Sequence, residues 1–154
     1  MNIKKITSKK EKIEICKNVI EKLPEWFDEQ GRRDYVSGVE ASEVWGCFID
    51  EKPVGFISIK SNNEFTSEIY VFGVLQEYHR NGVGSRLLEA ACKKLKNDKV
   101  KLLIVKTLDE SADYEPYNQT RNFYQKHDFI PIDVYKKIWS EENPCLLMTK
   151  IINT

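Results

Sequence analysis

Hydrophobic and polar positions along the chain switch repeatedly between helical and extended periodicity. The first helical pattern begins at Ser8, whose spacing to Glu11 is that of a capping box. Apolar residues then recur at helical intervals as far as Leu23. A second, weaker helix is predicted over Asp28–Gly38. We therefore expect two helices before the first predicted strand.

Three extended runs follow. Val44–Ile49 and Val54–Ile59 are rich in β-forming residues and are separated by the turn-like segment Asp50-Glu51-Lys52-Pro53. This arrangement predicts a hairpin. Phe65–Val74 is the third run, and it leads into a segment that contains two glycines.

Helical periodicity returns at Gly84, with apolar residues on one face as far as Leu95. The next run, Val100–Val105, is apolar throughout except for Lys101. Continuous apolar runs are typical of strands that are covered on both faces. We therefore expect Val100–Val105 to be central in the sheet.

The last part of the chain predicts one helix and two closing strands. The helix covers Tyr117–His127, and the strands are Phe129–Ile132 and Leu146–Ile151. An irregular segment around Trp139 and Pro144 is expected to join the two strands. Because helical and extended patterns alternate without a linker or repeat, residues 1–154 are interpreted as one α/β domain.

Composition narrows the possible functions. The chain has 24 Lys+Arg and 24 Asp+Glu, so no net positive field favours nucleic acid or an anionic membrane as a partner. The four cysteines lack a CxxC pair and the chain has two histidines, which argues against a zinc site or a disulfide scaffold. No apolar stretch approaches the roughly 20 residues of a membrane span. We expect a soluble, cytoplasmic protein with reduced thiols.

The glycine-containing turn His79–Gly84 carries the clearest chemical signal. It lies between a predicted strand and a predicted helix, where backbone N–H groups and the helix dipole can bind an anion such as a pyrophosphate. The spacing differs from that of a P-loop. It also lacks the third glycine of GxGxxG, which weakens ATP and dinucleotide interpretations.

This turn resembles the acetyl-CoA signature R/Q-x-x-G-x-G/A of the GCN5-related N-acetyltransferase (GNAT) superfamily. The corresponding positions are His79, Arg80, Asn81, Gly82, Val83 and Gly84. Residues 122–129, NFYQKHDF, are similar to the family's FYxxxGF segment. Asp128 stands where the family has glycine, and we expect a left-handed backbone there, which Asp tolerates better than most residues.

The resemblance implies an acyl-CoA N-acyltransferase fold of a small, single-domain bacterial type. We expect a mixed, mostly antiparallel sheet of about seven strands, splayed between the fourth and fifth strands and flanked by about four helices. Acetyl-CoA would be the co-substrate, with no metal. The residues expected to bind it are Phe72, Gly73, Val74, His79, Arg80, Asn81, Gly82, Val83, Gly84, Ser85 and Asn118. Gly73 is also expected to allow a bulge in its strand.

Acetyl transfer to an amine needs a proton donor for the departing thiolate. The resemblance assigns this role to Tyr124, because a phenol remains protonated at neutral pH. Spacing alone favours a core aromatic residue beside Phe123, and only the resemblance to the family favours a proton donor.

A base for the incoming amine is the second requirement, and Glu68 is the candidate. It lies eleven residues before His79, the separation at which histone acetyltransferases of this superfamily carry a strand glutamate. Strand alternation would place Glu68 on one face with Tyr70 and Phe72. The alternative is a solvated residue on an outer strand, and Glu64 is a weaker candidate.

Four further residues are open to more than one interpretation. Trp26 and Phe27 resemble a segment that helps form the acceptor site in some bacterial members, although buried packing is the favoured role for at least one of them. Cys145 is interpreted as a core residue rather than a nucleophile. His127 is interpreted as a helix-terminal cap or a surface residue.

The sequence therefore predicts an N-acetyltransferase that passes an acetyl group directly to a primary amine of a small molecule, peptide or protein. The expected oligomeric state is a monomer or a homodimer. The alternative is a non-catalytic acyl-CoA sensor or interaction module with the same fold.

Overall fold

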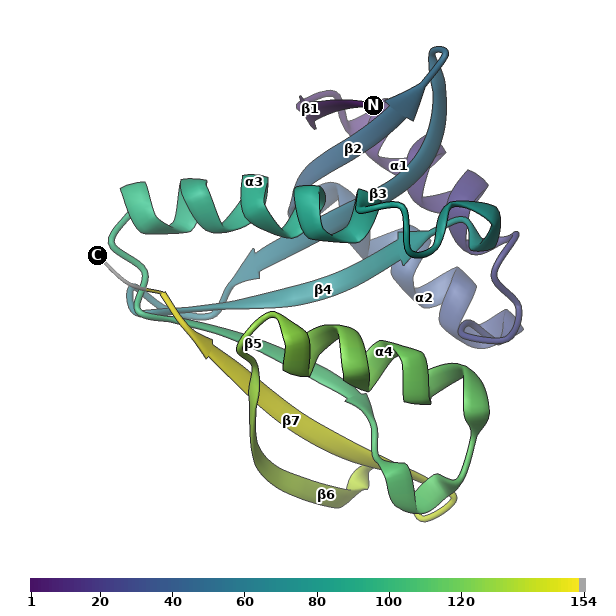
Figure 1. The fold of residues 1–154 in the computed structure, drawn as a ribbon, viewed down its shortest axis with the longest axis vertical. Coiled ribbons are helices and arrows are strands. Elements are labelled where there is room, and N and C mark those ends of the chain that lie inside the picture. The colour runs from purple at the N-terminus through teal and green to yellow at the C-terminus, as the bar shows by residue number, and fades with distance from the viewer. Residues whose placement is uncertain (153–154) are drawn as a thin grey trace.

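The computed structural model describes residues 1–152, and its strands form a single mixed sheet (Figure 1). The strands are β1 (Asn2–Ile6), β2 (Glu43–Ile49), β3 (Lys52–Ser61), β4 (Thr66–Val74), β5 (Leu102–Leu108), β6 (Ile130–Ser140) and β7 (Asn143–Ile151). The α-helices are α1 (Lys9–Ile20), α2 (Glu29–Gly38), α3 (Val83–Asn97) and α4 (Glu115–Lys126). No helix of the described residues is long and apolar enough to cross a membrane.

The strand order is β1-β2-β3-β4-β5-β7-β6, and β4–β5 is a parallel pair while the other neighbours are antiparallel. β4 and β5 are paired only where Thr66–Glu68 faces Leu102–Ile104. Beyond these residues the two strands diverge, which divides the sheet into two halves (Figure 1). The predicted fold class, including the splay between the fourth and fifth strands, is confirmed.

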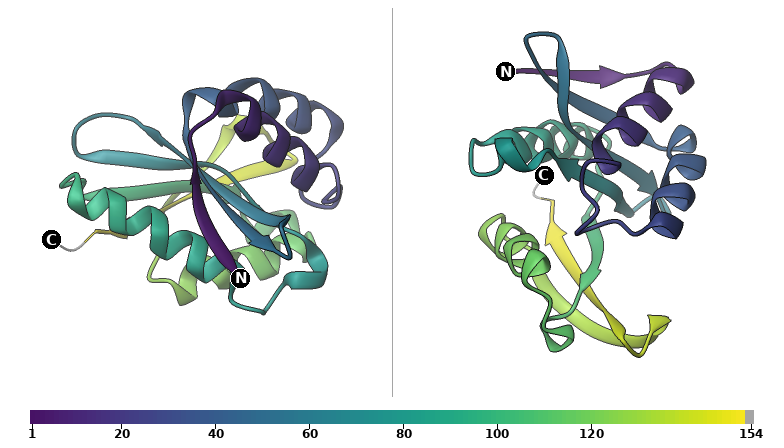
Figure 2. Two further views of the ribbon diagram at one scale, coloured as in Figure 1. Left: turned by 90° about the horizontal axis from the view of Figure 1, so that it is seen from above. Right: turned by 90° about the vertical axis from the view of Figure 1, so that its right-hand side faces the viewer.

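Helices cover both faces of the sheet. Figure 2 shows α1 and α2 on one face, with α3 and α4 on the other. The apolar stripe of α3 packs inward, as its periodicity predicts. Together with the sheet, these helices enclose fully buried side chains, including Val19, Ile20, Phe56, Ile57, Leu87 and Leu103.

Several local signals in the sequence act as predicted. The Ser8 hydroxyl accepts a hydrogen bond from the Glu11 N–H at 3.3 Å, which caps α1. Asp50 and Glu51 both have positive φ in the β2–β3 turn, as a tight hairpin requires. Asp128 has φ +69°, which confirms the expected left-handed backbone after α4.

Two strand predictions are wrong. β1 was not predicted, because its sequence NIKKI has few apolar residues and its side chains are mostly exposed at the sheet edge. The segment around Trp139 and Pro144 is extended, since these residues lie in β6 and β7, although the pairing of the two strands is irregular between Tyr135 and Ser140. The predicted strand Phe129–Ile132 corresponds to the beginning of β6, which continues to Ser140. Every side chain of β6 is exposed, so no buried face marks the continuation in the sequence.

A bulge in β4 corrects two further expectations. Ser58 is paired with Val71 and Ile59 with Ile69, so Tyr70 is the extra residue, whereas Gly73 is in regular register with Phe56. An extra residue reverses the alternation of side chains beyond it. Phe72 therefore does not share a face with Tyr70.

Contacts on the two faces show this reversal. The Tyr70 hydroxyl donates to the Asp34 carbonyl of α2 at 3.3 Å. In contrast, the Phe72 ring lies 5.6 Å from that of Phe123 in α4, on the opposite face. Gly73 faces α1 again, where an added Cβ would lie 3.2 Å from side-chain atoms of Leu23 and Val19.

Candidate functional site

The gap between β4 and β5 is the centre of the candidate site. Glu68 and Ile104 are the last paired residues, and from there to Val74 the edge of β4 has no strand beside it on the β5 side. Backbone N–H and C=O groups along this edge are available to a ligand, as at any unpaired strand edge. Phe72, Gly73 and Val74 lie on this stretch.

The glycine turn lies at the end of β4. Arg80 and Gly82 both have positive φ, +66° and +81°, and α3 begins at Val83. The Arg86 N–H donates to the Gly82 carbonyl at 3.1 Å, so the amides of Val83, Gly84 and Ser85 precede the first helical hydrogen bond. Apart from Gly82 itself and its two neighbours in the chain, no atom of the described residues lies within 4 Å of a Cβ built on Gly82. The turn therefore offers amides and open space to an anion.

Histidine 79 is held within the protein by both its backbone and its ring. Its N–H donates to the Gln76 carbonyl at 3.1 Å, and its Nε2 lies 2.7 Å from the Val74 carbonyl. Its ring also meets the Trp26 ring edge-on, with centroids 5.5 Å apart. His79 thus fastens the turn to the end of β4, while the Asn81 N–H is occupied by the Tyr78 carbonyl at 3.4 Å.

A second histidine joins the start of α3 to the end of α4. His127 is the C-cap residue of α4, as expected, and its Nε2 lies 2.9 Å from the Ser85 hydroxyl. Lys150 donates to the His127 carbonyl at 2.7 Å. Burial and the Lys150 ammonium lower the pKa of His127, so the ring is neutral at pH 7.

Aromatic side chains fill the space below the turn. Phe72 of β4 and Phe123 of α4 meet across the sheet splay. A Cβ on Gly84 would lie 3.1 Å from Phe123 Cε2, so glycine at this position permits the ring to approach α3. The two glycines of the turn therefore differ, since Gly82 borders open space and Gly84 borders packed aromatic rings.

Tyr124 is 5% exposed and packs against two other rings. Its centroid lies 5.6 Å from that of Phe123 and 5.1 Å from that of Phe129. Burial raises the pKa of Tyr124, and the nearby phenols of Tyr117 and Tyr35 raise it further. The phenol therefore keeps its proton at and well above neutral pH.

Glu68 lies at the point where β4 and β5 part. Its side chain is 19% exposed, and its Oε2 lies 3.4 Å from the Lys106 ammonium of β5. Its Oε1 accepts from the Asn62 amide at 3.2 Å. The carboxylate is thus half-buried and held in place by two partners.

Asn118 lies in the first half of α4 and is held by hydrogen bonds within that helix. Its Oδ1 accepts a hydrogen bond from Arg121, and its amide donates to Glu115 at 2.8 Å. Arg121 is buried and also donates to the Leu108 carbonyl at 2.5 Å. Asn118 therefore helps to anchor α4 to the end of β5.

Hydrogen bonds link the start of α4 to the loop between α1 and α2. The Trp26 indole donates to the Pro116 carbonyl at 3.1 Å, and the Tyr117 hydroxyl donates to the Trp26 carbonyl at 2.6 Å. Tyr114 donates to the Glu25 carbonyl at 2.7 Å. These bonds join the two halves of the molecule. Sequence spacing did not indicate them, because the partners lie about ninety residues apart.

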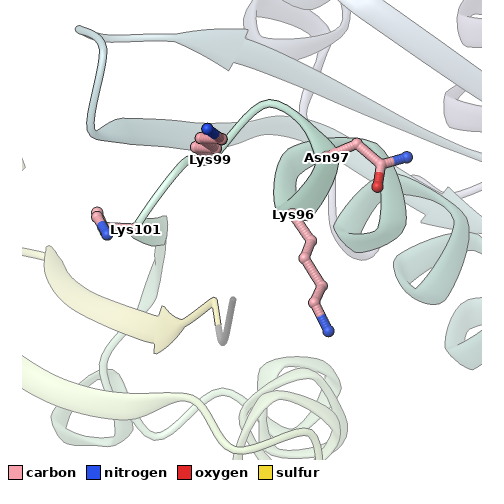
Figure 3. Close-up of a pocket in the computed structure, with 4 residues that line it drawn as sticks. All are labelled: Lys96, Asn97, Lys99 and Lys101. Atoms are coloured by element: carbon pink, nitrogen blue, oxygen red, sulfur yellow. The ribbon is translucent and has the colours of Figure 1, made fainter.

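The structure also places the predicted core residue Cys145 and contains a cavity lined mainly by lysines. Cys145 is fully buried, which confirms its assignment to the core. A cavity of about 520 Å³ at the far end of α3 is lined by Lys96, Asn97, Lys99 and Lys101. Their side chains point in different directions (Figure 3), and the cavity is separate from the glycine turn. Within residues 1–152, no three His, Cys, Asp or Glu side chains are grouped as metal ligands.

Solved structures share this architecture. A chain from Desulfovibrio desulfuricans assigned to the GNAT family is 15% identical, with a TM-score of 0.85 and 99% of each chain covered. The aminoglycoside 6'-N-acetyltransferase from Enterococcus faecium is 15% identical, with a TM-score of 0.77, covering 100% of this chain and 98% of the other. A GNAT acetyltransferase from Elizabethkingia anophelis with acetyl-CoA bound is 20% identical, with a TM-score of 0.63 over 80% and 83%.

Comparison at the level of sequence identifies a family. No curated protein matches the chain. The model of the acetyltransferase (GNAT) family matches residues 11–129, which include both the glycine turn and the segment from Asn122 to Phe129. The chain belongs to the acetyltransferase (GNAT) family.

Proposed function

We propose that this protein is an N-acetyltransferase that uses acetyl-CoA as donor and passes the acetyl group directly to a primary amine. The observation that carries the proposal is the opening between β4 and β5 beside the free amides of α3. A strand edge and a helix N-terminus next to each other suit a ligand with an amide-containing arm and a pyrophosphate.

The residues at this opening fit acetyl-CoA. The amides of Val83, Gly84 and Ser85, with the open space beside Gly82, would receive the phosphates. The edge of β4 around Phe72–Val74 would receive the pantetheine arm, and a backbone N–H there would stabilise the developing oxyanion. When bound, acetyl-CoA supplies the acetyl group as a thioester.

In the proposed reaction, side chains of this protein carry out the proton transfers. Tyr124 Oη holds a proton because burial disfavours its phenolate, so it can donate to a leaving thiolate. Glu68 lies at the start of the opening and is proposed to accept the proton of the incoming amine, directly or through a water. Lys106 and Asn62 hold its carboxylate in place for that task.

The test is release of free CoA from acetyl-CoA in the presence of a broad panel of primary amines, followed with a thiol reagent. We expect release that depends on the amine, together with a product heavier than the amine by one acetyl group. The same panel with acetyl-CoA alone and with amine alone gives the background.

A binding-only protein would give a different pair of results. It would be protected from thermal unfolding by acetyl-CoA, as any ligand that binds the native state protects it. No amine of the panel would then be acetylated. That combination would contradict the proposed transferase and favour the acyl-CoA sensor.

A further inference from the structure

Aromatic rings from three elements line up on the α2 side of the sheet. The Tyr35 ring of α2 lies 5.7 Å from Phe27, which precedes α2, and 5.2 Å from Tyr70 of β4, both in edge-to-face geometry. We call Phe27, Tyr35 and Tyr70 the aromatic wall. All three side chains are partly exposed. Tyr70 faces α2, since its hydroxyl donates to the Asp34 carbonyl of that helix.

The wall adjoins the groups proposed for catalysis. Burial raises the pKa of Tyr35, and the charges of Tyr70 and Glu68 raise it further. Tyr35 in turn contributes to the raised pKa of Tyr124 and of Tyr117. Geometry places the wall beside Glu68, because Lys60 of β3 is paired with Glu68 of β4 and its ammonium lies over the Tyr70 ring. The wall is therefore a surface along which an acceptor can approach Glu68.

The wall already receives an amine of the protein itself. The Lys60 ammonium lies 3.6 Å from the centroid of the Tyr70 ring, which is a close cation–π contact. Lys106 provides a second ammonium beside Glu68. Both positive charges oppose the entry of a ligand that carries several cationic groups.

The nearby carboxylates are engaged with partners in the chain. Asp34 accepts from the Gln30 amide at 2.9 Å, and Glu68 is held by Lys106 and Asn62. A polycation would have to break these pairs, whereas a single amine on an apolar body needs one proton acceptor and an aromatic surface.

We propose that the acetyl acceptor is a primary amine carried on an apolar or aromatic body, with that body packed against Tyr35 and Tyr70, and not a polycation. The inference rests on the proposed acetyl transfer. In the reaction the amine nitrogen forms a bond to the acetyl carbon as the carbon–sulfur bond breaks. The proton lost by the amine passes to Glu68, and the thiolate takes one from Tyr124.

The experiment compares three acceptors at equal concentration: 2-phenylethylamine, spermidine and kanamycin. We expect kcat/KM for 2-phenylethylamine to exceed that for either polycation by at least tenfold. Equal or better use of spermidine or kanamycin overturns the proposed acceptor class.

Two variants of one residue test the wall. Tyr35→Leu removes the ring, and we expect the KM for 2-phenylethylamine to rise about threefold to tenfold, with kcat within twofold. Tyr35→Phe keeps the ring and is expected to leave KM within twofold. Equal thermal protection of both variants by CoA shows that the fold is intact. An unchanged KM in Tyr35→Leu overturns the role of the wall.

Calorimetry separates this inference from the proposed function. Binding of 2-phenylethylamine and spermidine to the CoA-saturated protein is measured without turnover. Tighter binding of 2-phenylethylamine, weakened in Tyr35→Leu, supports the acceptor class even for a chain that transfers nothing. Tighter binding of spermidine overturns it. Absence of turnover with any amine contradicts only the proposed function.

Discussion

Tyr124 and Tyr117 lie on the same helix, yet their surroundings differ. Tyr117 donates its hydroxyl to the Trp26 carbonyl, whereas Tyr124 packs between the rings of Phe123 and Phe129. Burial raises the pKa of both phenols. Only Tyr124 is proposed to act on the thiolate, so variants of the two residues distinguish a chemical role from a structural one.

Tyr124→Phe is expected to lower kcat by about a hundredfold, the lower end of what general acid catalysis contributes. Acetyl-CoA affinity should stay within twofold, because the ring is retained. Tyr117→Phe is the control, which should lose about 1 kcal/mol of stability with its hydrogen bond and keep its turnover. Steady-state kinetics and urea unfolding measure these effects, and unchanged turnover in Tyr124→Phe would reject this residue as the acid.

The role of Glu68 can be separated from its ion pair. Glu68→Gln keeps the size of the side chain but cannot accept a proton from the amine, so we expect kcat to fall about tenfold or more. Lys106→Met removes the partner and leaves the carboxylate, and its turnover should fall less than that of Glu68→Gln. Initial rates at saturating acetyl-CoA give the comparison. Equal losses in both variants would mean that the ion pair, not the base, matters.

At the scale of elements, the start of α3 is expected to decide the affinity for acetyl-CoA. Gly82→Glu would place a carboxylate in the open space beside the first amides, where it competes with the phosphates. We expect at least a tenfold loss of acetyl-CoA affinity by calorimetry. Gly82→Asn is the control, since Asn tolerates φ +81° and adds no charge. If Gly82→Glu binds as tightly as the control, the phosphates do not lie at this turn.

Elements that bury one face could be predicted from the sequence, whereas the two edge strands were missed wholly or in part. The apolar stripe of α3 and the Ser8 cap of α1 are local, so periodicity and spacing reveal them. β1 and β6 lie at the two edges of the sheet and are mostly or wholly exposed, so β1 was missed and β6 was predicted only at its start.

The candidate site also has one part that the sequence predicts and another part that it does not. The glycine turn is one continuous motif, and the sequence placed it correctly before α3. The bulge at Tyr70 depends on how β3 pairs with β4, which no local pattern shows. Tyr35 and Tyr70 come together only through the packing of α2 on the sheet. These long-range contacts form the wall that is proposed to receive the acceptor, which is why local sequence patterns do not indicate it.

At the scale of the whole molecule, buried thiols and phenols make stability sensitive to alkali. Burial raises the pKa of Cys16 to about 12, and it also raises the pKa of Cys47, Cys92, Tyr35, Tyr117 and Tyr124. The unfolded chain ionises these groups at lower pH than the folded chain does. Their contribution is therefore fully present below about pH 8.5 and is lost as pH rises toward the folded pKa values.

We expect the free energy of unfolding in urea to fall from pH 8 to pH 10.5, with each such group contributing about 1.4 kcal/mol per pH unit between its two pKa values. Cys16→Ala should show a shallower decline than the parent, because it lacks the thiol with the raised pKa. A free energy of unfolding that stays constant across this range would contradict the assignment.

Binding of acetyl-CoA at the β4–β5 opening is tested by titrating the ¹⁵N-labelled protein with acetyl-CoA and following the backbone amide chemical shifts. We expect the largest changes in chemical shift at Phe72–Val74 and at Gly82–Ser85, on the two sides of the β4–β5 opening. The lysine-lined cavity formed by Lys96, Asn97, Lys99 and Lys101 should be little affected. Changes concentrated at that cavity, with the glycine turn unmoved, would contradict the proposed acetyl-CoA site.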